Sequence, residues 1–152
     1  MLQVKKVKPI GCQVLVTRER YTWDDENAAG IVDFGHMKGD LKTYQTVLAV
    51  GNDVSFVKPG DVVEINLYKY AVFKEDPNSV KALADNPIVE FRTNDVELVD
   101  DAGDMVMCML IDQRDVQYIL EDFEEVKYAK DDTLIKIPRP NQLILPSYRI
   151  KT

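Results

Sequence analysis

The sequence predicts an all-β fold, and three observations lead to this expectation. The strongest periodic signals along the chain have period two or are short apolar runs, which are the patterns of β-strands. Turn-forming Gly, Pro, Asn and Asp separate these runs. The chain has 152 residues, of which 45% are hydrophobic, so it has the length and composition of one domain with a buried core. Together these features are typical of a small β-barrel or sandwich.

The expected strands follow one another along the first 120 residues. The first two are Gln13–Thr17 and Gln45–Val50, and turn residues follow the second. Pro59 and Gly60 are placed for a type II turn, because Pro fixes one central φ at about −65° and Gly accepts the positive φ that follows. Further strands are expected at Asp61–Tyr68, Tyr70–Phe73, Ile88–Phe91, Val96–Val99 and Asp104–Ile111, and Asp112–Leu120 is either a turn with a short strand or one helical turn.

Two internal segments break this pattern. Residues 18–44 hold no convincing strand, and a loop of that length inside a compact domain is usually functional or mobile. Residues 74–87 contain Pro77 and Pro87 and are expected to be an insertion, with one helical turn over Val80–Ala84.

The last segment, residues 121–152, is expected to be an extended C-terminal arm that follows a domain covering residues 1–120. Pro138, Pro140 and Pro146 exclude a continuous helix and favour an extended chain. Its apolar residues are too many for a solvated tail, so we expect the arm to dock on another surface. These apolar residues are Leu134, Ile135, Ile137, Leu143, Ile144, Leu145 and Ile150.

Charge excludes some functions and divides the chain into two parts. A net charge of -7 argues against nucleic-acid binding, because phosphate neutralisation needs clustered Lys and Arg. The longest apolar run, Met105–Ile111, is too short to span a membrane, and the N-terminus has no export signal, so we expect a cytoplasmic protein without a membrane partner.

Residues 133–152 carry +4 and the whole chain carries -7, so the remaining residues carry -11. This basic tail is either solvated or lies on its own domain or on an identical neighbour.

The sequence offers little for catalysis. Cys12 and Cys108 lie in apolar segments, where buried thiols are expected. His36 is the single histidine, cannot complete a common zinc site alone, and is expected to be a solvent-exposed loop residue. No nucleophile elbow or phosphate-binding glycine loop is present. We therefore expect a protein that is not an enzyme, with no catalytic residues, no metal and no cofactor.

Aromatic residues gather in or beside the long loop. Tyr21, Trp23, Phe34 and Tyr44 are there, where a purely solvated loop would not place them. Two interpretations stay open, because these rings either anchor a partner or pack the loop over its own domain.

Five segments in order resemble the co-chaperonin (GroES-type, chaperonin-10) family. The segments are Lys8–Val16, like the family's opening strand; Ala29–Val32, like the end of its mobile loop; Val47–Gly51, like a strand ending in a Val-Gly turn; Val57–Val63, similar to its Val-Lys-x-Gly-Asp-x-Val signature; and Met109–Val116, like its closing segment. The resemblance covers roughly residues 8–120. It implies a small irregular GroES-like β-barrel whose copies form a seven-membered ring that caps a chaperonin chamber.

The resemblance also implies a partner-binding loop. Its residues would be Ala29, Gly30, Ile31, Val32 and Phe34, and its partners a chaperonin and copies of the chain itself. The family's docking tripeptide is wholly apolar, whereas Asp33 follows Val32 here. Burying Asp33 in an apolar groove would cost several kcal/mol without a partner, so either Phe34 becomes the third anchor or the loop no longer binds a chaperonin.

An alternative function belongs to a different class of protein. The added arm suits a phage-encoded relative, located in the host cytoplasm or in the virion, that reuses the barrel as a capsid-associated structural (decoration) protein. Its partners would then be capsid protein and its own copies. The arm contacts would come from Lys136, Ile137, Arg139, Leu143, Ile144 and Leu145.

Overall fold

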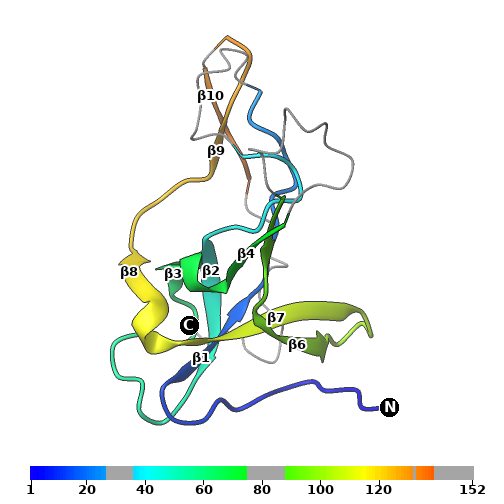
Figure 1. Ribbon diagram of the computed structural model, residues 1–152, viewed down its shortest axis with the longest axis vertical. Coiled ribbons are helices and arrows are strands. Elements are labelled where there is room, and N and C mark those ends of the chain that lie inside the picture. Colours follow the sequence, from blue (N-terminus) through cyan, green and yellow to red (C-terminus); the bar gives the residue numbers. More distant parts are fainter. Residues whose placement is uncertain (27–35, 75–87, 132, 139–152) are drawn as a thin grey trace.

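A computed structural model of the chain describes residues 1–26, 36–74, 88–131 and 133–138. The described residues form an all-β structure of ten strands and two short 3-10 helices (Figure 1). In chain order these elements are β1 (Gln13–Thr17), β2 (Tyr44–Val50), β3 (Val62–Ile65), η1 (Tyr68–Tyr70), β4 (Ala71–Lys74), β5 (Ile88–Phe91), β6 (Asn94–Val99), β7 (Met105–Asp112), η3 (Gln113–Asp115), β8 (Val116–Leu120), β9 (Val126–Tyr128) and β10 (Leu134–Lys136). The predicted fold class, all-β, is confirmed.

One antiparallel sheet dominates the structure. Its six strands have the order β6-β7-β1-β2-β3-β8, and two separate hairpins are formed by β4 with β5 and by β9 with β10. The ladder ends at β6 on one side and at β8 on the other, so the pairings among the described strands leave it open. No helix in the described part of the chain is long and apolar enough to cross a membrane.

The sheet curves around one main core. Along β1, Val14 and Val16 point into this core while Leu15 points to the opposite face, as the period of two requires. Irregular pairing between Leu15 and Val16 in β1, and between Glu64 and Ile65 in β3, adds local bending. The buried residues of the main core are Val14, Val16, Leu41, Val47, Val57, Val63, Ile65, Leu67, Met109 and Ile111.

A second, smaller core lies on the other face of the sheet. It contains Leu15, Leu48, Leu98 and Cys108. The N-terminal segment covers this cluster with Val4 and Val7, and the Val99 N–H donates to the Val4 carbonyl at 2.8 Å.

Two glycines hold turns that the sheet needs. At the predicted turn Gly60 has φ 96°, and the Asp61 N–H donates to the Lys58 carbonyl at 3.1 Å, which confirms a turn over Pro59 and Gly60. At Gly51 an added Cβ would lie 2.2 Å from the Gly11 carbonyl oxygen. Only a residue without a side chain therefore fits at position 51, where the two backbone segments approach each other.

All the predicted strands are present, and most of them differ from the prediction by one to three residues at an end. Gln13–Thr17 and Ile88–Phe91 are strands with the predicted bounds. The strand expected over Asp61–Tyr68 is shorter, because the chain turns into η1 after Leu67. Asp112–Leu120 combines both alternatives, since η3 is followed by β8 and the Asp112 carboxylate accepts the Arg114 N–H at 2.8 Å. Of the expected insertion, residues 75–87 lie outside the described residues.

The expectation of an extended arm directly after residue 120 is wrong. Residues 126–136 form the β9–β10 hairpin, closed by the Ala129 N–H, which donates to the Thr133 carbonyl at 2.9 Å. The Ile137 N–H donates to the Glu125 carbonyl at 2.7 Å and extends the pairing to the base of the hairpin. The first of the prolines on which the extended arm was predicted is Pro138. It follows the hairpin in the sequence and therefore does not interrupt the pairing of β9 with β10.

Candidate functional site

The segment predicted as a long loop has an ordered base, which we call the loop stem (residues 18–26 and 36–43). Its two halves run antiparallel away from β1 and β2 (Figure 1). The Gly39 N–H donates to the Tyr21 carbonyl at 2.8 Å, and the Tyr21 N–H donates to the Asp40 carbonyl at 2.8 Å. Further out, the Asp25 N–H donates to the His36 carbonyl at 3.1 Å. The backbone is therefore paired up to the point where residues 27–35 begin.

Residues 27–35, which we call the loop tip, include every residue of the predicted partner-binding loop. Ala29, Gly30, Ile31, Val32 and Phe34 all lie outside the described residues. The stem fixes where the tip starts and ends, because Asp25 and His36 are hydrogen-bonded across it.

The aromatic residues of the stem pack against one another. Tyr21 stacks on His36 with ring centroids 3.6 Å apart, and Trp23 contacts both rings edge-on at 5.4 Å. Tyr44, at the start of β2, contacts Tyr21 edge-on at 6.2 Å. These three predicted anchors are therefore in contact within their own chain, as the second interpretation expected. The prediction of an exposed His36 is wrong, since only 15% of its side chain is exposed.

Lys42 lies at the centre of this cluster, and no local sequence pattern distinguishes it from the other lysines. It is 5% exposed, and its Nζ lies 3.1 Å from Glu125 Oε2 and 3.7 Å from Glu19 Oε2. Three aromatic rings also surround the ammonium group, with centroid distances of 5.0 Å for Trp23, 5.5 Å for Tyr44 and 5.7 Å for Tyr21. Carboxylates and ring faces both stabilise a cation removed from water.

The two tyrosines of the cluster stay neutral over a wide pH range. Burial raises the pKa of the Tyr21 hydroxyl and raises that of Tyr44 far above its ordinary value, and the nearby charge of Glu125 raises both pKa values further. The cluster is therefore an ion-paired lysine among neutral rings.

Packing around the cluster is incomplete. Trp23 Nε1 and His36 Nε2 are buried and have no hydrogen-bond partner among the residues that the structure describes. A cavity of about 270 Å³ remains between the stem and the chain that leads into β9, lined in part by His36, Tyr44, Phe123 and Glu125. The stem and the C-terminal segment thus meet over an interface with room for rearrangement.

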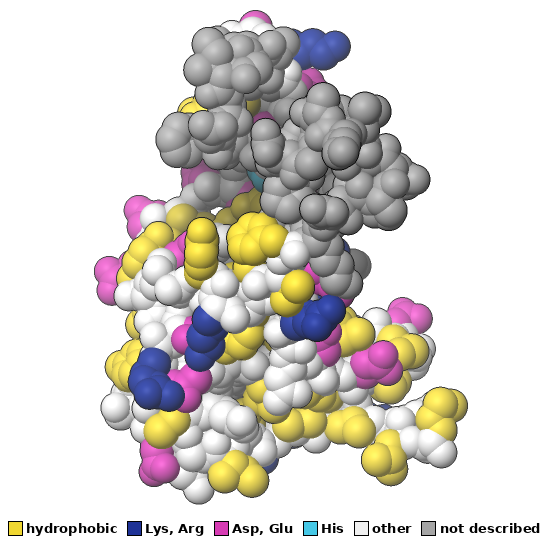
Figure 2. All heavy atoms as spheres, in the orientation of Figure 1, with side chains coloured by type: hydrophobic (Ala, Val, Ile, Leu, Met, Phe, Trp, Pro, Cys, Tyr) yellow, Lys and Arg dark blue, Asp and Glu magenta, His cyan; other side chains and the backbone are white. Residues whose placement is uncertain are grey.

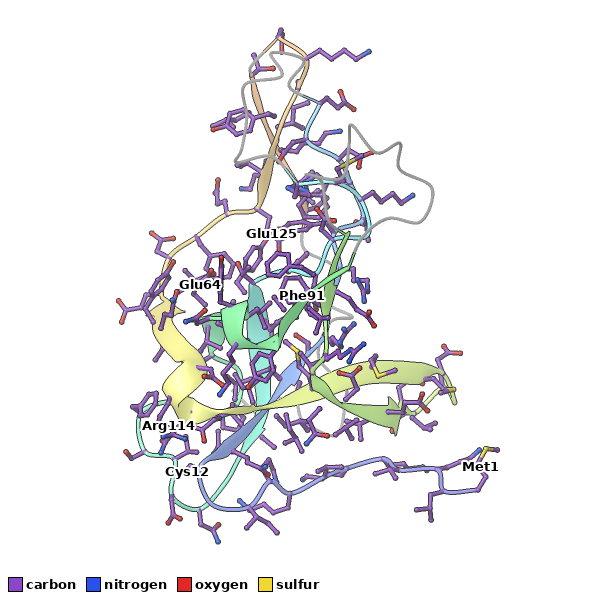
Figure 3. The ribbon with its side chains drawn as sticks, in the orientation of Figure 1. Met1, Cys12, Glu64, Phe91, Arg114 and Glu125 are labelled. Atoms are coloured by element: carbon purple, nitrogen blue, oxygen red, sulfur yellow. The ribbon has the colours of Figure 1, made fainter. Side chains whose placement is uncertain are left out.

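The β9–β10 hairpin joins the stem directly. The Glu26 N–H donates to the Tyr128 carbonyl at 2.7 Å, and the Tyr128 N–H donates to Asp25 Oδ1 at 3.0 Å. Lys127 Nζ lies 3.5 Å from Glu26 Oε1. At the base of the hairpin Glu125 lies between the sheet and β9 (Figure 3), where it reaches Lys42. The C-terminal segment thus contacts the stem through Glu125 and Tyr128, while Leu134 and Ile135, two of the apolar residues expected to dock, remain exposed.

The predicted arm contacts are only partly described. Lys136 is exposed and pairs with Glu124 at 3.0 Å, and Ile137 continues the hairpin pairing. The other four, Arg139, Leu143, Ile144 and Leu145, lie outside the described residues.

A second hollow, of about 1130 Å³, lies between the stem and the turn from β5 to β6. Arg18, Arg20 and Arg92 line it together with Asp40, Glu90 and Asp95. Arg18 is held by Asp95 at 3.1 Å, and the numbers of positive and negative side chains are equal, so this hollow has no net preference for an anion. In the described ranges, no group of three or more His, Cys, Asp and Glu side chains is placed to hold a metal ion.

No protein-family model matches the chain, and no curated protein matches it significantly. The geometry of the loop stem, the aromatic cluster and the β9–β10 hairpin is therefore what bears on function.

Proposed function

We propose that this chain is a co-chaperonin-like, ring-forming lid subunit that docks its loop tip on a chaperonin and so assists protein folding. The observation that carries the proposal is the loop stem, an ordered support that extends from β1 and β2 and ends at Asp25 and His36. The tip that it carries contains the apolar residues Ile31, Val32 and Phe34. A short apolar segment held at both ends loses less conformational freedom on binding than a free loop does.

The curvature of the main sheet supports a barrel-like subunit. β1, β2, β3 and β7 all contribute side chains to one core, and Val116 and Ile119 of β8 pack against it from the far end of the sheet. A sheet that bends around one core in this way is the arrangement expected of a small irregular GroES-like barrel.

Lateral association of copies is supported by two exposed features. Among the described strands β8 forms one edge of the main sheet, where a further strand can pair, and its Tyr118 side chain is 54% exposed. The N-terminal segment packs on the second face of the sheet through Val4 and Val7, and its end projects from the body with Met1 and Leu2 fully or largely exposed (Figures 2 and 3). A strand edge and an extended apolar segment are suited to repeated contacts between identical subunits, as a ring requires.

Docking of the tip is tested with charge substitutions. Ile31→Asp or Val32→Asp should abolish co-sedimentation with a nucleotide-loaded chaperonin, because a buried unpaired carboxylate opposes binding in an apolar groove. Met37→Asp is the matched control, since Met37 lies in the stem and is 70% exposed. Native mass spectrometry with and without chaperonin reports ring size and the complex. Wild-type binding by both tip variants contradicts the proposal.

A second candidate function is a capsid-associated structural protein, and the β9–β10 hairpin favours it. The hairpin exposes apolar side chains that a neighbouring chain would cover, namely Val126, Tyr128, Leu134 and Ile135. Ending the chain after Pro138 removes the basic tail but keeps Glu125 against Lys42. This truncation should prevent incorporation into particles if the tail clamps neighbours, and normal incorporation contradicts that function.

A further inference from the structure

The loop stem and the β9–β10 hairpin are distant in sequence but are joined at two places. At the base of the hairpin, Glu125 pairs with Lys42 at 3.1 Å, and both side chains are almost fully buried. At the far end of β9, the backbone of Tyr128 is hydrogen-bonded to Asp25 and Glu26. These contacts hold β9 alongside the first half of the stem.

Asp25 connects three pieces of chain at the edge of the loop tip. Its Oδ1 accepts the Tyr128 N–H at 3.0 Å from the hairpin. Its Oδ2 accepts the His36 N–H at 3.1 Å and lies 2.8 Å from His36 Nδ1, across the stem. Because Glu26 is the last described residue before the tip and His36 the first after it, this carboxylate fixes both ends of the tip and the hairpin together.

The hairpin contributes little to either apolar core. All three residues of β10 are exposed, and Leu134 retains 58% of its accessible surface. A two-stranded hairpin is marginal in water without further packing. Its position therefore depends on the ion pair at Glu125 and the hydrogen bonds at Tyr128 more than on packing against either apolar core.

We propose that the β9–β10 hairpin is a detachable clamp on the loop stem. When the clamp is closed, the Lys42–Glu125 pair and the Asp25 junction hold the ends of the tip at a fixed spacing. When it opens, Asp25, Glu26 and Lys42 lose their partners in the hairpin and the stem loosens, while the main sheet keeps its core. A ligand that engages either the loop stem or the β9–β10 hairpin then changes the affinity at the other, because such coupling is reciprocal. The clamp is a property of the chain itself and does not depend on the identity of a partner.

Hydrogen exchange of the full-length chain tests the clamp. Glu125→Gln weakens the buried pair, so the amides of Tyr128 in the hairpin and of Gly39 and Lys42 in the stem should exchange faster by about tenfold or more, and by the same factor. The matched control is Glu124→Gln, which removes the same charge one residue earlier. The Glu124–Lys136 pair is 61% and 69% exposed, so its loss should change these rates less than about twofold.

The sheet amides show whether the fold survives. In Glu125→Gln the amides of β1 and β7 should still exchange more slowly than those of Tyr128, Gly39 and Lys42. The proposal is overturned if Tyr128 exchanges faster while Gly39 and Lys42 do not, because the hairpin would then open without loosening the stem. It is also overturned if all three amides keep their wild-type rates.

A second variant covers the case in which Glu125→Gln unfolds the sheet as well. The double variant Lys42→Met/Glu125→Leu replaces the pair with apolar groups and should restore protection of the sheet. In mild denaturant its stem and hairpin amides should still open together before those of β7. Separate opening of stem and hairpin in this variant overturns the clamp.

Discussion

The main core and the stem–hairpin cluster are buried to a similar degree but are built from different chemistry. Val14 and Met109 in the main core are 0% exposed, and Lys42 and Glu125 in the cluster are 5% and 7% exposed. The main core is apolar, so its stabilisation is non-directional and tolerates small shifts. The cluster depends on the placement of charges, so it favours one arrangement and is weakened sharply when one partner is removed. The first region holds the fold, and the second sets where the loop tip is presented.

The largest expected effect is in the cluster. Glu125→Ala leaves the Lys42 ammonium buried with only Glu19 nearby, so the free energy of unfolding should fall by about 3–5 kcal/mol. Urea denaturation followed by circular dichroism measures this loss. If the free energy of unfolding falls by less than about 1 kcal/mol, water reaches Lys42, and the cluster is not a buried charged region comparable with the main core.

A substitution in the main core should lower the free energy of unfolding slightly less than Glu125→Ala does, but its effect should extend over more of the sheet. Met109→Ala removes a fully buried side chain from the main core and should lower the free energy of unfolding by about 2–4 kcal/mol. Its effect should appear in the exchange rates of the sheet amides. If faster exchange is confined to amides of the loop stem, the main core and the stem–hairpin cluster are not independent.

Alkaline pH should affect the cluster before the core. Tyr21 and Tyr44 have raised pKa values because burial disfavours the phenolate, so folding favours their protonated forms. This contribution to stability is fully present below the unfolded-state pKa of about 10 and is lost as the pH rises above it. In an absorbance titration, Tyr21 and Tyr44 should ionise at higher pH in the folded chain than in the chain unfolded in urea. Ionisation of these two tyrosines at the same pH in both states would contradict the burial of the cluster.

The smallest effect concerns cysteine reactivity on the second face of the sheet. Burial raises the pKa of the Cys108 thiol to about 12, so almost no reactive thiolate forms at neutral pH. Cys12, predicted to be buried, is partly exposed. Iodoacetamide should modify Cys12 in the native protein and leave Cys108 unmodified, as mass spectrometry of the digest would show. Equal labelling would mean that the sheet opens readily at Cys108.

The sequence predicts the main sheet well and the stem–hairpin cluster poorly, for physical reasons. Alternation in β1 and the turn at Pro59 and Gly60 are local signals that depend on neighbouring residues alone. The pairing of Lys42 with Glu125 joins positions 83 residues apart, and no local pattern indicates it. The alternate spacing of Tyr21 and Trp23 is a period-two signal that could have indicated an extended, partly buried stem. The assignment of the tip to partner binding stays a prediction, since those residues lie outside the described ranges.

The hairpin was missed because neither of its short strands buries an apolar face. Leu134, Ile135 and Lys136 are all exposed, so an apolar pair stands beside a charged residue with no buried face between them. This strand forms because its backbone pairs with Val126–Tyr128, which in turn lie against the stem. The amino-acid pattern of β10 alone does not indicate that pairing.

Trp23 is the one tryptophan of the chain and stands inside the cluster, 5.0 Å from the Lys42 ammonium and edge-on to Tyr21 and His36. Its indole emission is therefore sensitive to the position of a cation and of a histidine ring, both of which would move if β9 left the stem. The protein carries a built-in optical reporter at the place where its two distant segments meet. Stopped-flow fluorescence can follow their separation in real time without any added label.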